Sequence, residues 1–385
     1  MHSTRYLIVG GGMTGDAAAK GIREHDADGP IAVVGIEPHP PYKRPPLTKG
    51  LWSGDDEARI WRNTKESTGA EVIVGRRIVG LDLDARRATD DAGVEYAWEK
   101  LLLATGGRPR EIPGAEGVLY YRTFEDYRWL RAHVAAGSRV VVIGGGFIGS
   151  ELAAALVGIG VSATMVFPED GICARLFPAA LSAFVTDYYR ERQVEVLTGE
   201  TVAGVARGRV TLGSGRGLET DVVVAGLGIV PNTELAEAAG LTVDDGIVVD
   251  EFGRVDGRDD VFAAGDVASF PAAALGRRMR VEHEDHANSH GRAVGANMAG
   301  AGARYDHLPF FYSDMFDLGY EAVGEVDSRH DTVERWDEPN RKGVVAYVDG
   351  AGAPRGFLLW NVWDKLEAAR ERIAAMAPFG EGPLV

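Results

Sequence analysis

Two short apolar runs, Leu7–Val9 and Val140–Ile143, begin a pattern of hydrophobic and polar positions that occurs twice in the chain. Each run is bounded by glycine, which is typical of a buried strand in a parallel sheet. An alanine-rich stretch that predicts a helix follows each time. The pattern therefore predicts two β-α-β units, one at the start of the chain and one in its middle.

A G-x-G-x-x-G sequence joins strand to helix in both units. The first glycine allows a tight turn, the second lets backbone approach a pyrophosphate, and the third lets the helix pack closely on the strand. The N-terminus of the following helix favours phosphate. The predicted cofactor-binding positions are Gly10, Gly12, Met13, Thr14 and Gly15 in the first unit, and Gly144, Gly146, Phe147, Ile148 and Gly149 in the second.

An acidic residue follows the second strand of each unit. Glu37 ends "IAVVGIE" and Glu169 lies in "VSATMVFPED". A carboxylate at this position binds the hydroxyl groups of an adenosine ribose. A single glycine cluster can arise by chance, but two complete units predict two dinucleotides. Two nicotinamides have no chemical use together, so the sequence indicates a flavoprotein that takes hydride from a nicotinamide.

The segments between and after the two units predict the domain organisation. "LLLATGGRPR" and "VVVAGLGIVPNTEL" are strands with glycine exits, and "DDVFAAGDVASF" returns the chain to the first domain. Aromatic strand-like runs begin near Asp306. We expect an α/β fold with two Rossmann-like, glutathione reductase-like domains and a small α+β domain. The predicted ranges are 1–107 with 229–305 for FAD, 108–228 for NAD, and 306–385 for the C-terminal domain.

Composition narrows the classes of partner. The 385 residues are 45% hydrophobic and 25% charged, with a net charge of −16. An acidic surface suits neither nucleic acid nor an anionic membrane, and no apolar run is long enough to span a bilayer. The first strand begins almost at once, which leaves no room for a targeting peptide. We therefore expect a cytoplasmic protein.

One cysteine, Cys173, occurs in the chain. It cannot form an intramolecular disulfide, so the protein cannot reduce disulfides through a cysteine pair. Cys173 is then either a packed thiol, which is the favoured interpretation, or a reactive one. No set of His, Cys, Asp or Glu has metal-ligand spacing, and no metal site is predicted.

Taken in order, the motifs resemble those of the FAD-dependent NADH reductases, which include ferredoxin and rubredoxin reductases and the apoptosis-inducing factor group. The likeness is greatest to the last group. It depends on "PPYKRPPLTKGLWSGDD", "GGGFIGSELA", "GLGIVPNTEL", "AAGDVASF", "GRRMRVEHEDHA", "LGYEAVGEVDS" and "GFLLWNVW". Two positions depart from the family pattern: Tyr312 stands in place of a tryptophan, and Glu284 in place of a histidine. The long C-terminal insertion of apoptosis-inducing factor is missing, so its cell-death role is not carried over.

The resemblance implies roles for individual residues. Lys49 lies beside flavin N5 with Glu151 next to it, and Arg44 also faces the flavin. Without the resemblance, the sequence is equally consistent with Lys49 and Glu151 as charged residues on the surfaces of helices. Phe147 shields the flavin, or is a core phenylalanine. Further implied FAD contacts are Val79, Ala104, Thr105, Gly106, Arg122, Gly265 and Asp266, while Glu282, His283 and Tyr312 line the region where nicotinamide meets flavin.

For the nicotinamide dinucleotide, the resemblance adds Arg175, Gly228, Glu321 and Asn361 to Glu169. Glu169 favours NADH, because it would repel a ribose 2′-phosphate, although Arg175 could serve such a phosphate. Lys49, Glu151 and His283 are the predicted catalytic residues.

The implied function is transfer of electrons from NADH through FAD to a small iron–sulfur carrier such as a ferredoxin or rubredoxin. Two alternatives remain open. One is an NADH dehydrogenase or oxidase that uses quinone or oxygen. The other is a redox sensor of the apoptosis-inducing factor type, with slow turnover and a long-lived reduced complex. A homodimer is also left open.

Overall fold

The computed structural model describes residues 2–378 and 383–385, which form two compact units. The first unit comprises 1–43, 57–108 and 230–309, and the second comprises 44–56, 109–229 and 310–385. The predicted α/β class, with two Rossmann-like parts and a sheet-rich C-terminal part, is confirmed. The separate C-terminal domain stays a prediction, because this division groups 310–385 with the second nucleotide-binding segment.

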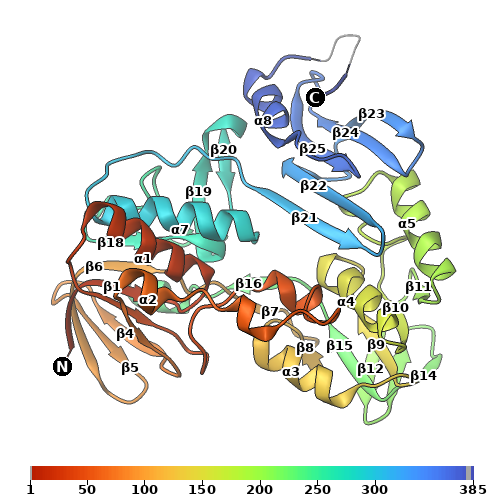
Figure 1. The fold of residues 1–385 in the computed structure, drawn as a ribbon, viewed down its shortest axis with the longest axis horizontal. Helices are drawn as coiled ribbons and strands as arrows, with labels where there is room; N and C mark the ends of the chain where they lie inside the picture. The colour runs from red at the N-terminus through yellow and green to blue at the C-terminus, as the bar shows by residue number, and fades with distance from the viewer. Residues whose placement is uncertain (1, 379–382) are drawn as a thin grey trace. The chain divides into compact units, whose positions relative to one another are not determined.

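The first unit is built around a seven-stranded sheet in the order β3-β2-β1-β6-β5-β4, with β18 beside β6 (Figure 1). Its parallel strands are β1 (His2–Val9), β2 (Ile31–Val34), β3 (Glu71–Ile73), β6 (Glu95–Leu103) and β18 (Val261–Ala263). The antiparallel strands β4 (Ile78–Asp82) and β5 (Arg87–Asp90) extend one edge. The carboxyl ends of β1, β6 and β18 therefore lie side by side.

Helices α1 (Met13–His25) and α7 (Glu284–Met298) lie against each other and against this sheet (Figure 1). Their buried residues join those of β1 and β2 in one apolar cluster, which includes Ile8, Ala18, Val33 and Val294. Short elements complete the unit: η2 (Glu57–Ile60), α2 (Thr64–Thr68), α6 (Glu234–Ala238), η3 (Gly265–Val267), η4 (Ala273–Leu275), and a small sheet of β17 (Ile247–Val248), β19 (Ala268–Ala272) and β20 (Arg277–Met279).

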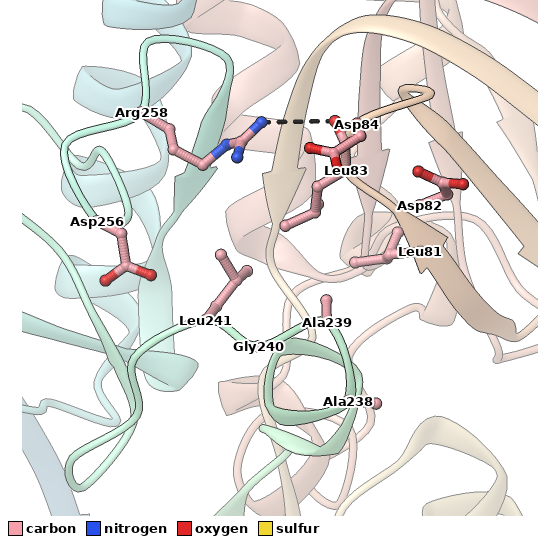
Figure 2. Close-up of a pocket in the computed structure, with 10 residues that line it drawn as sticks. All are labelled: Leu81, Asp82, Leu83, Asp84, Ala238, Ala239, Gly240, Leu241, Asp256 and Arg258. Carbon is pink, nitrogen blue, oxygen red and sulfur yellow. Dashed lines mark hydrogen bonds between the residues drawn. The ribbon is translucent and has the colours of Figure 1, made fainter.

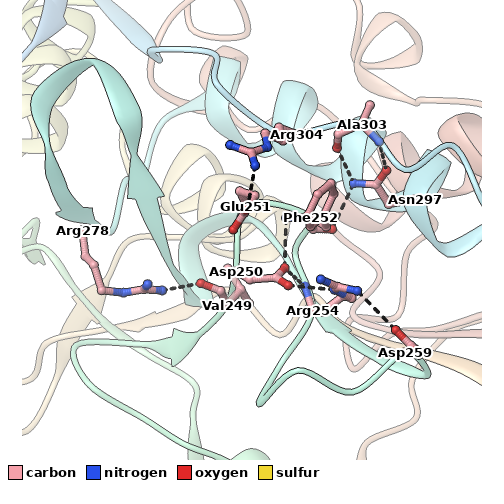
Figure 3. A network of polar contacts seen from close by, with 10 residues as sticks. All are labelled: Val249, Asp250, Glu251, Phe252, Arg254, Asp259, Arg278, Asn297, Ala303 and Arg304. Carbon is pink, nitrogen blue, oxygen red and sulfur yellow. Dashed lines mark hydrogen bonds and ion pairs between the residues drawn. The ribbon is translucent and has the colours of Figure 1, made fainter.

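The turn at residues 249–259 is held by polar contacts (Figure 3). Asp250 accepts hydrogen bonds from the backbone of Phe252 and Arg254 at 2.9 Å each, and from Arg254 Nε at 2.7 Å. The Asn297 amide of α7 donates to the Phe252 carbonyl at 3.0 Å. These contacts fix the C-terminal end of α7 to the turn.

The second unit contains a five-stranded parallel sheet in the order β11-β10-β9-β15-β8. Its strands are β8 (Val118–Tyr120), β9 (Arg139–Ile143), β10 (Ser162–Val166), β11 (Glu195–Leu197) and β15 (Val222–Ala225), with helices α3 (Phe124–His133), α4 (Phe147–Gly158) and α5 (Ala179–Glu191). An antiparallel sheet of β12 (Val202–Ala206), β13 (Arg209–Leu212) and β14 (Gly217–Glu219) adjoins it. The strands β7 (Gly107–Pro109) and β16 (Ile229–Pro231) pair where the chain passes from one unit to the other.

The last part of the chain forms an antiparallel sheet in the order β21-β22-β25-β24-β23, with helix α8 (Leu366–Ala375) packed against it (Figure 1). The strands are β21 (Phe310–Met315), β22 (Leu318–Gly324), β23 (Asp331–Glu338), β24 (Lys342–Val348) and β25 (Pro354–Trp360). Tyr320 and Trp360 stack at 5.7 Å, and Phe177 meets both rings edge-on at 5.3 Å. These buried rings join the sheet to the segment that precedes α5.

The segment 44–56, which contains η1 (Pro45–Thr48), belongs to the second compact unit, and the domain boundaries expected from the sequence stay predictions. Lys49 falls in the range predicted for the first domain, yet its segment packs within the second unit. Tyr121 Oη donates to the Leu47 carbonyl at 2.5 Å, and Trp52 meets Tyr127 edge-on at 5.6 Å. Leu47 and Trp52 are both buried, and η1 packs against α3 and α4 of the second unit, which explains the grouping.

An open groove lies in the first unit, between the turn that follows β4 and the end of α6 (Figure 2). Arg258 crosses it and donates to the Leu83 carbonyl at 3.4 Å. None of the site residues predicted from the sequence lines this groove. Among the residues that the structure describes, no helix is both long and apolar enough to cross a membrane.

Candidate functional site

The first glycine-rich turn follows β1, and its three glycines meet three different environments. Gly10 has φ +134°, and a Cβ there would lie 2.0 Å from the Ala104 carbonyl oxygen. A Cβ on Gly15 would lie 2.1 Å from the Gly10 carbonyl oxygen, so α1 packs directly on the end of the strand. Gly12, by contrast, faces open space. The second position is thus the one where a ligand can approach the backbone.

The second turn, after β9, repeats this arrangement. A Cβ on Gly144, which has φ +117°, would lie 2.4 Å from the Gly226 carbonyl oxygen, and one on Gly149 would lie 2.0 Å from the Gly144 carbonyl oxygen. Gly146 faces open space, as Gly12 does. Both turns therefore have the shape that a pyrophosphate requires at a helix N-terminus.

Glu37 lies three residues beyond β2, half-buried, and accepts a hydrogen bond from Tyr42 Oη at 2.5 Å. This tyrosine orients the carboxylate and was not predicted from the sequence. Two apolar side chains of the same unit are unusually exposed: Ile36 at 53% and Val79 at 54%. Ile36 adjoins Glu37 in the chain, whereas Val79 lies on β4, and the expected role of Val79 stays a prediction.

Ala104, Thr105 and Gly106 follow β6 and adjoin the first glycine turn. The Ala104 N–H donates to the Val9 carbonyl at 2.8 Å. Thr105 and Asn232 exchange two hydrogen bonds: Thr105 Oγ1 donates to the Asn232 carbonyl at 2.7 Å, and Asn232 Nδ2 donates to the Thr105 carbonyl at 2.8 Å. Asn232 therefore holds this loop through both the hydroxyl and the carbonyl group of Thr105.

Gly265 and Asp266 form η3 at the end of β18. Gly265 has φ +74°, and a Cβ there would lie 2.2 Å from Thr14 Oγ1 in the first turn of α1. His283 is the N-cap residue of α7; desolvation lowers its pKa to about 4, while Asp266 and Asp285 act in the opposite direction. Glu282 is exposed and pairs with Arg280 at 2.6 Å. The first unit thus brings the predicted glycine turn and the Gly265–Asp266 turn together.

Lys49 and Glu151 form a close ion pair within the second unit, with 2.9 Å between Nζ and Oε1. Glu151 is 7% exposed and also accepts hydrogen bonds from Thr48 Oγ1 at 2.5 Å and Ser313 Oγ at 2.6 Å. Lys49 Nζ also lies 3.3 Å from Asp314 Oδ2 and 4.6 Å from the centre of the Tyr312 ring. The pairing expected from the sequence is present, whereas Thr48, Ser313 and Asp314 were not predicted.

Other predicted residues of the second unit surround this cluster. Arg44 Nη1 donates to the Arg122 carbonyl at 2.9 Å, so these two arginines lie together. Phe147, half-buried at the start of α4, meets Phe311 edge-on at 5.2 Å, and Ile148 beside it is 36% exposed. Tyr312 is 40% exposed. The aromatic side chains therefore form a partly open apolar surface near the Lys49–Glu151 pair.

Glu169 lies just beyond β10 and pairs with Arg175, with 2.8 Å between Oε1 and Nη2. The arginine side chain is 85% exposed and the carboxylate 26% exposed. The second nucleotide unit therefore has both a carboxylate, Glu169, and an exposed guanidinium group, Arg175, at its expected ribose position. Such a pair can hold ribose hydroxyls through the acid, or a phosphate through the arginine.

The other three residues expected to contact the nicotinamide dinucleotide differ in their hydrogen bonds. They are Gly228, Glu321 and Asn361. Gly228 has φ +79° and accepts a hydrogen bond from the Arg110 N–H at 2.9 Å. Glu321 Oε2 is buried without a hydrogen-bond partner in the described residues, and desolvation, with Asp364 second, raises its pKa. The Asn361 amide is occupied by the Arg341 carbonyl and the Gly319 N–H, at 2.8 Å each. Asn361 therefore has a structural role that its sequence context did not indicate.

Cys173 is buried, and burial raises the pKa of its thiol to about 12. A thiol in this state is neither nucleophilic nor exposed to an oxidant. The interpretation as a packed residue is confirmed.

The residues present fit two dinucleotides. Each unit offers a glycine turn with one open position, a helix N-terminus and an acid at the next strand end. In the first unit Glu37 and the Gly265–Asp266 turn would hold FAD. In the second, Glu169 would hold the ribose of a nicotinamide dinucleotide.

Comparison with known proteins agrees with this geometry. The family model described as pyridine nucleotide-disulphide oxidoreductase matches residues 4–291, and the C-terminal model of mitochondrion-associated apoptosis-inducing factor matches residues 294–341. The chain is 34% identical to apoptosis-inducing factor 1 of Dictyostelium discoideum, over 96% of this chain and 78% of that protein. It is 36% identical to the ferredoxin–NAD(+) reductase component of the anthranilate 1,2-dioxygenase system of Burkholderia cepacia, over 98% of this chain and 96% of that protein.

Among solved structures, the chain is similar to the reductase in a covalent putidaredoxin reductase–putidaredoxin complex. The TM-score is 0.91 at 29% identity, over 98% of this chain and 94% of that one.

Proposed function

Because the chain belongs to the pyridine nucleotide-disulphide oxidoreductase family, as a relative of ferredoxin reductases and apoptosis-inducing factor, we propose that it oxidises NADH through FAD and passes single electrons to a small iron–sulfur carrier. The protein is an oxidoreductase with FAD and a nicotinamide dinucleotide as cofactors. The observation that carries the proposal is the duplicated glycine turn, in which the first and third glycines are closed by backbone and the second is open.

Bound FAD supplies the redox chemistry, since a flavin accepts hydride and releases electrons one at a time. The chain supplies binding, orientation and charge. Glu37, fixed by Tyr42, and Glu169 hold the two riboses. Lys49, fixed by Glu151, supplies positive charge for the flavin, and Glu151 is itself held by Thr48 and Ser313. Orientation of this kind supplies much of the catalysis.

The proposed acceptor is a ferredoxin- or rubredoxin-type protein. Support comes from two similar proteins. One is a ferredoxin–NAD(+) reductase component, and the other is a putidaredoxin reductase in complex with putidaredoxin. The single buried cysteine is consistent with it, because reduction of a disulfide through a cysteine pair is impossible here. NADH is the proposed donor, because Glu169 occupies the ribose position.

A second candidate is favoured by the match of residues 294–341 to the C-terminal model of apoptosis-inducing factor. In that case the protein is an NADH-sensing flavoprotein with slow turnover, a quinone or oxygen acceptor, and dimerisation that depends on NADH.

Turnover separates the two candidates. The protein is reduced with NADH without oxygen and then mixed with ferredoxins, rubredoxins and quinones. Rapid reoxidation by an iron–sulfur protein supports the reductase. A long-lived reduced complex that no iron–sulfur carrier reoxidises supports the sensor.

A further inference from the structure

Two buried histidines of α7, His286 and His290, have no role in the function described above. They are 0% and 1% exposed. His290 Nδ1 accepts a hydrogen bond from the Gly265 N–H at 3.3 Å, and its ring stacks on Tyr305 at 4.5 Å. His286 stacks instead on Phe270 at 4.6 Å. Of the two, His290 is bonded to the turn where FAD is expected.

The Gly265 turn needs an acceptor from elsewhere in the fold. Its positive φ and the closeness of Thr14 Oγ1 exclude a side chain at position 265, so the Gly265 N–H group is satisfied from another element. A buried N–H group without an acceptor costs stability. His290 supplies that acceptor, and the bonded N–H group lies one residue before Asp266, an expected FAD contact.

Helix α7 holds His290 in a fixed place. A Cβ on the neighbouring Gly291 would lie 2.6 Å from the Thr14 carbonyl oxygen, and one on Gly295 would lie 2.1 Å from the Ala18 carbonyl oxygen. The two helices are therefore in backbone contact. Asn297 anchors the far end of α7 to the carbonyls of Phe252 and Ala303, at 3.0 and 2.8 Å (Figure 3).

The hydrogen bond also fixes the state of the ring. An acceptor at Nδ1 requires a neutral imidazole with its proton on Nε2. Burial lowers the pKa of His290 to about 3, so the ring is neutral at physiological pH. Nε2 is itself buried and makes no hydrogen bond within the described residues, so the Gly265 N–H is what selects the tautomer.

We propose that His290 is a positioning residue, whose Nδ1 holds the Gly265–Asp266 turn in the conformation that binds FAD. The inference rests on the proposed function, because it assumes that FAD binds at this turn. Beyond that function, the proposal requires a hydrogen-bond acceptor at position 290, which the packing of α7 alone does not require.

His290→Asn and His290→Leu form the matched pair for a test. The two replacements have the same shape and lose the same ring stacking, but only asparagine keeps an acceptor near the place of Nδ1. FAD is removed from each protein and its dissociation constant is measured by flavin fluorescence. We expect His290→Asn to stay within about 3-fold of wild type and His290→Leu to bind FAD about 10- to 100-fold more weakly.

Thermal unfolding of the FAD-free proteins separates this role from a general loss of stability. Leucine suits the buried site at least as well as asparagine, so equal losses of FAD affinity in the two variants, or a greater loss in His290→Asn, would overturn the proposal. If neither variant folds, nitrogen NMR of histidine-labelled wild type decides: the Nε2–H form with a hydrogen-bonded Nδ1 is expected, and the Nδ1–H form would overturn it. Failure of wild type to bind FAD would instead refute the proposed function.

Discussion

Lys49 and Glu151 lie 2.9 Å apart, joined as an ion pair that is 17% exposed on the lysine side and 7% on the glutamate side. The glutamate is further held by two hydroxyl groups, Thr48 and Ser313. A largely buried pair is costly to form unless its remaining hydrogen bonds are satisfied, and here they are. Such a pair in a chain with two dinucleotide turns is expected to serve the flavin chemistry.

Lys49→Met should slow reduction of the flavin by NADH, because a cation that favours the anionic reduced ring is lost. Removing one partner of a buried pair typically costs about 3–5 kcal/mol of stability, and the partial exposure of Lys49 makes the lower end more appropriate. Glu151→Gln should act chiefly on nicotinamide placement. Stopped-flow reduction measures both, and the double mutant should lose less than the sum of the single losses.

Asp314→Asn is the matched control for that pair. Its carboxylate also lies near Lys49 Nζ, at 3.3 Å, but is 58% exposed. Exposed ion pairs are worth little, so this change should slow flavin reduction much less than Lys49→Met. Strictly additive effects of Lys49→Met and Glu151→Gln, or an equal effect of Asp314→Asn, would remove the pair from the mechanism.

The two glycine positions of the second turn should respond differently to alanine. A Cβ on Gly146 meets open space, so Gly146→Ala should fold normally, keep FAD and bind NADH more weakly, because the methyl group occupies the approach to the backbone. Gly144→Ala would place a Cβ 2.4 Å from the Gly226 carbonyl at φ +117°, and should lower the melting temperature. Calorimetric titration with NADH, together with thermal unfolding, tests the contrast. Unchanged NADH affinity in Gly146→Ala would place the dinucleotide elsewhere.

Glu169 and Arg175 should set the choice between NADH and NADPH. Glu169→Ala removes ribose hydrogen bonds worth about 1–3 kcal/mol, so NADH affinity should fall about 5- to 150-fold and the gap to NADPH should narrow. Arg175→Ala should weaken NADPH more than NADH, because the arginine is the available phosphate ligand. Identical kinetics with both cofactors in both variants would show that neither residue contacts the adenosine end.

Stability should decrease as the solution becomes acidic. His286 and His290 are buried and neutral when folded, with pKa values lowered by burial, to about 3 for His290. In the unfolded chain they take up protons near their ordinary value of 6.5. The unfolded state then binds more protons, so the free energy of unfolding falls between about pH 6.5 and pH 3, by about 1.4 kcal/mol per pH unit for each group at most. Urea unfolding at several pH values measures this, and a flat profile across the upper part of the window would contradict it.

Several parts of the site could be read from the sequence because they are local. Gly10, Gly15 and Glu37 depend on a strand, a turn and a helix that follow one another in the chain. Because the β-α-β unit occurs twice, the expected positions in one copy could be compared with those in the other. The aromatic composition after residue 306 likewise predicted the strands there.

The parts that could not be read depend on tertiary contacts. Tyr42 reaches Glu37 through a loop, and Ser313 reaches Glu151 from a strand of the C-terminal sheet. The packing of Trp52 against Tyr127 groups the segment of Lys49 with the second unit, which no local pattern in the sequence indicates. The hydrogen bonds of the Asn361 amide to Gly319 and Arg341 likewise arise only when β25 is paired with β22 and β24.

Anaerobic titration of the purified protein with NADH, followed by addition of an oxidised ferredoxin, tests whether electrons pass from NADH through FAD to an iron–sulfur carrier. We expect a yellow protein with one FAD per chain, loss of the flavin absorbance with one equivalent of NADH, and rapid return of that absorbance as two ferredoxins are reduced. A colourless protein that cannot take up FAD, or a flavin that NADH leaves oxidised, would contradict it.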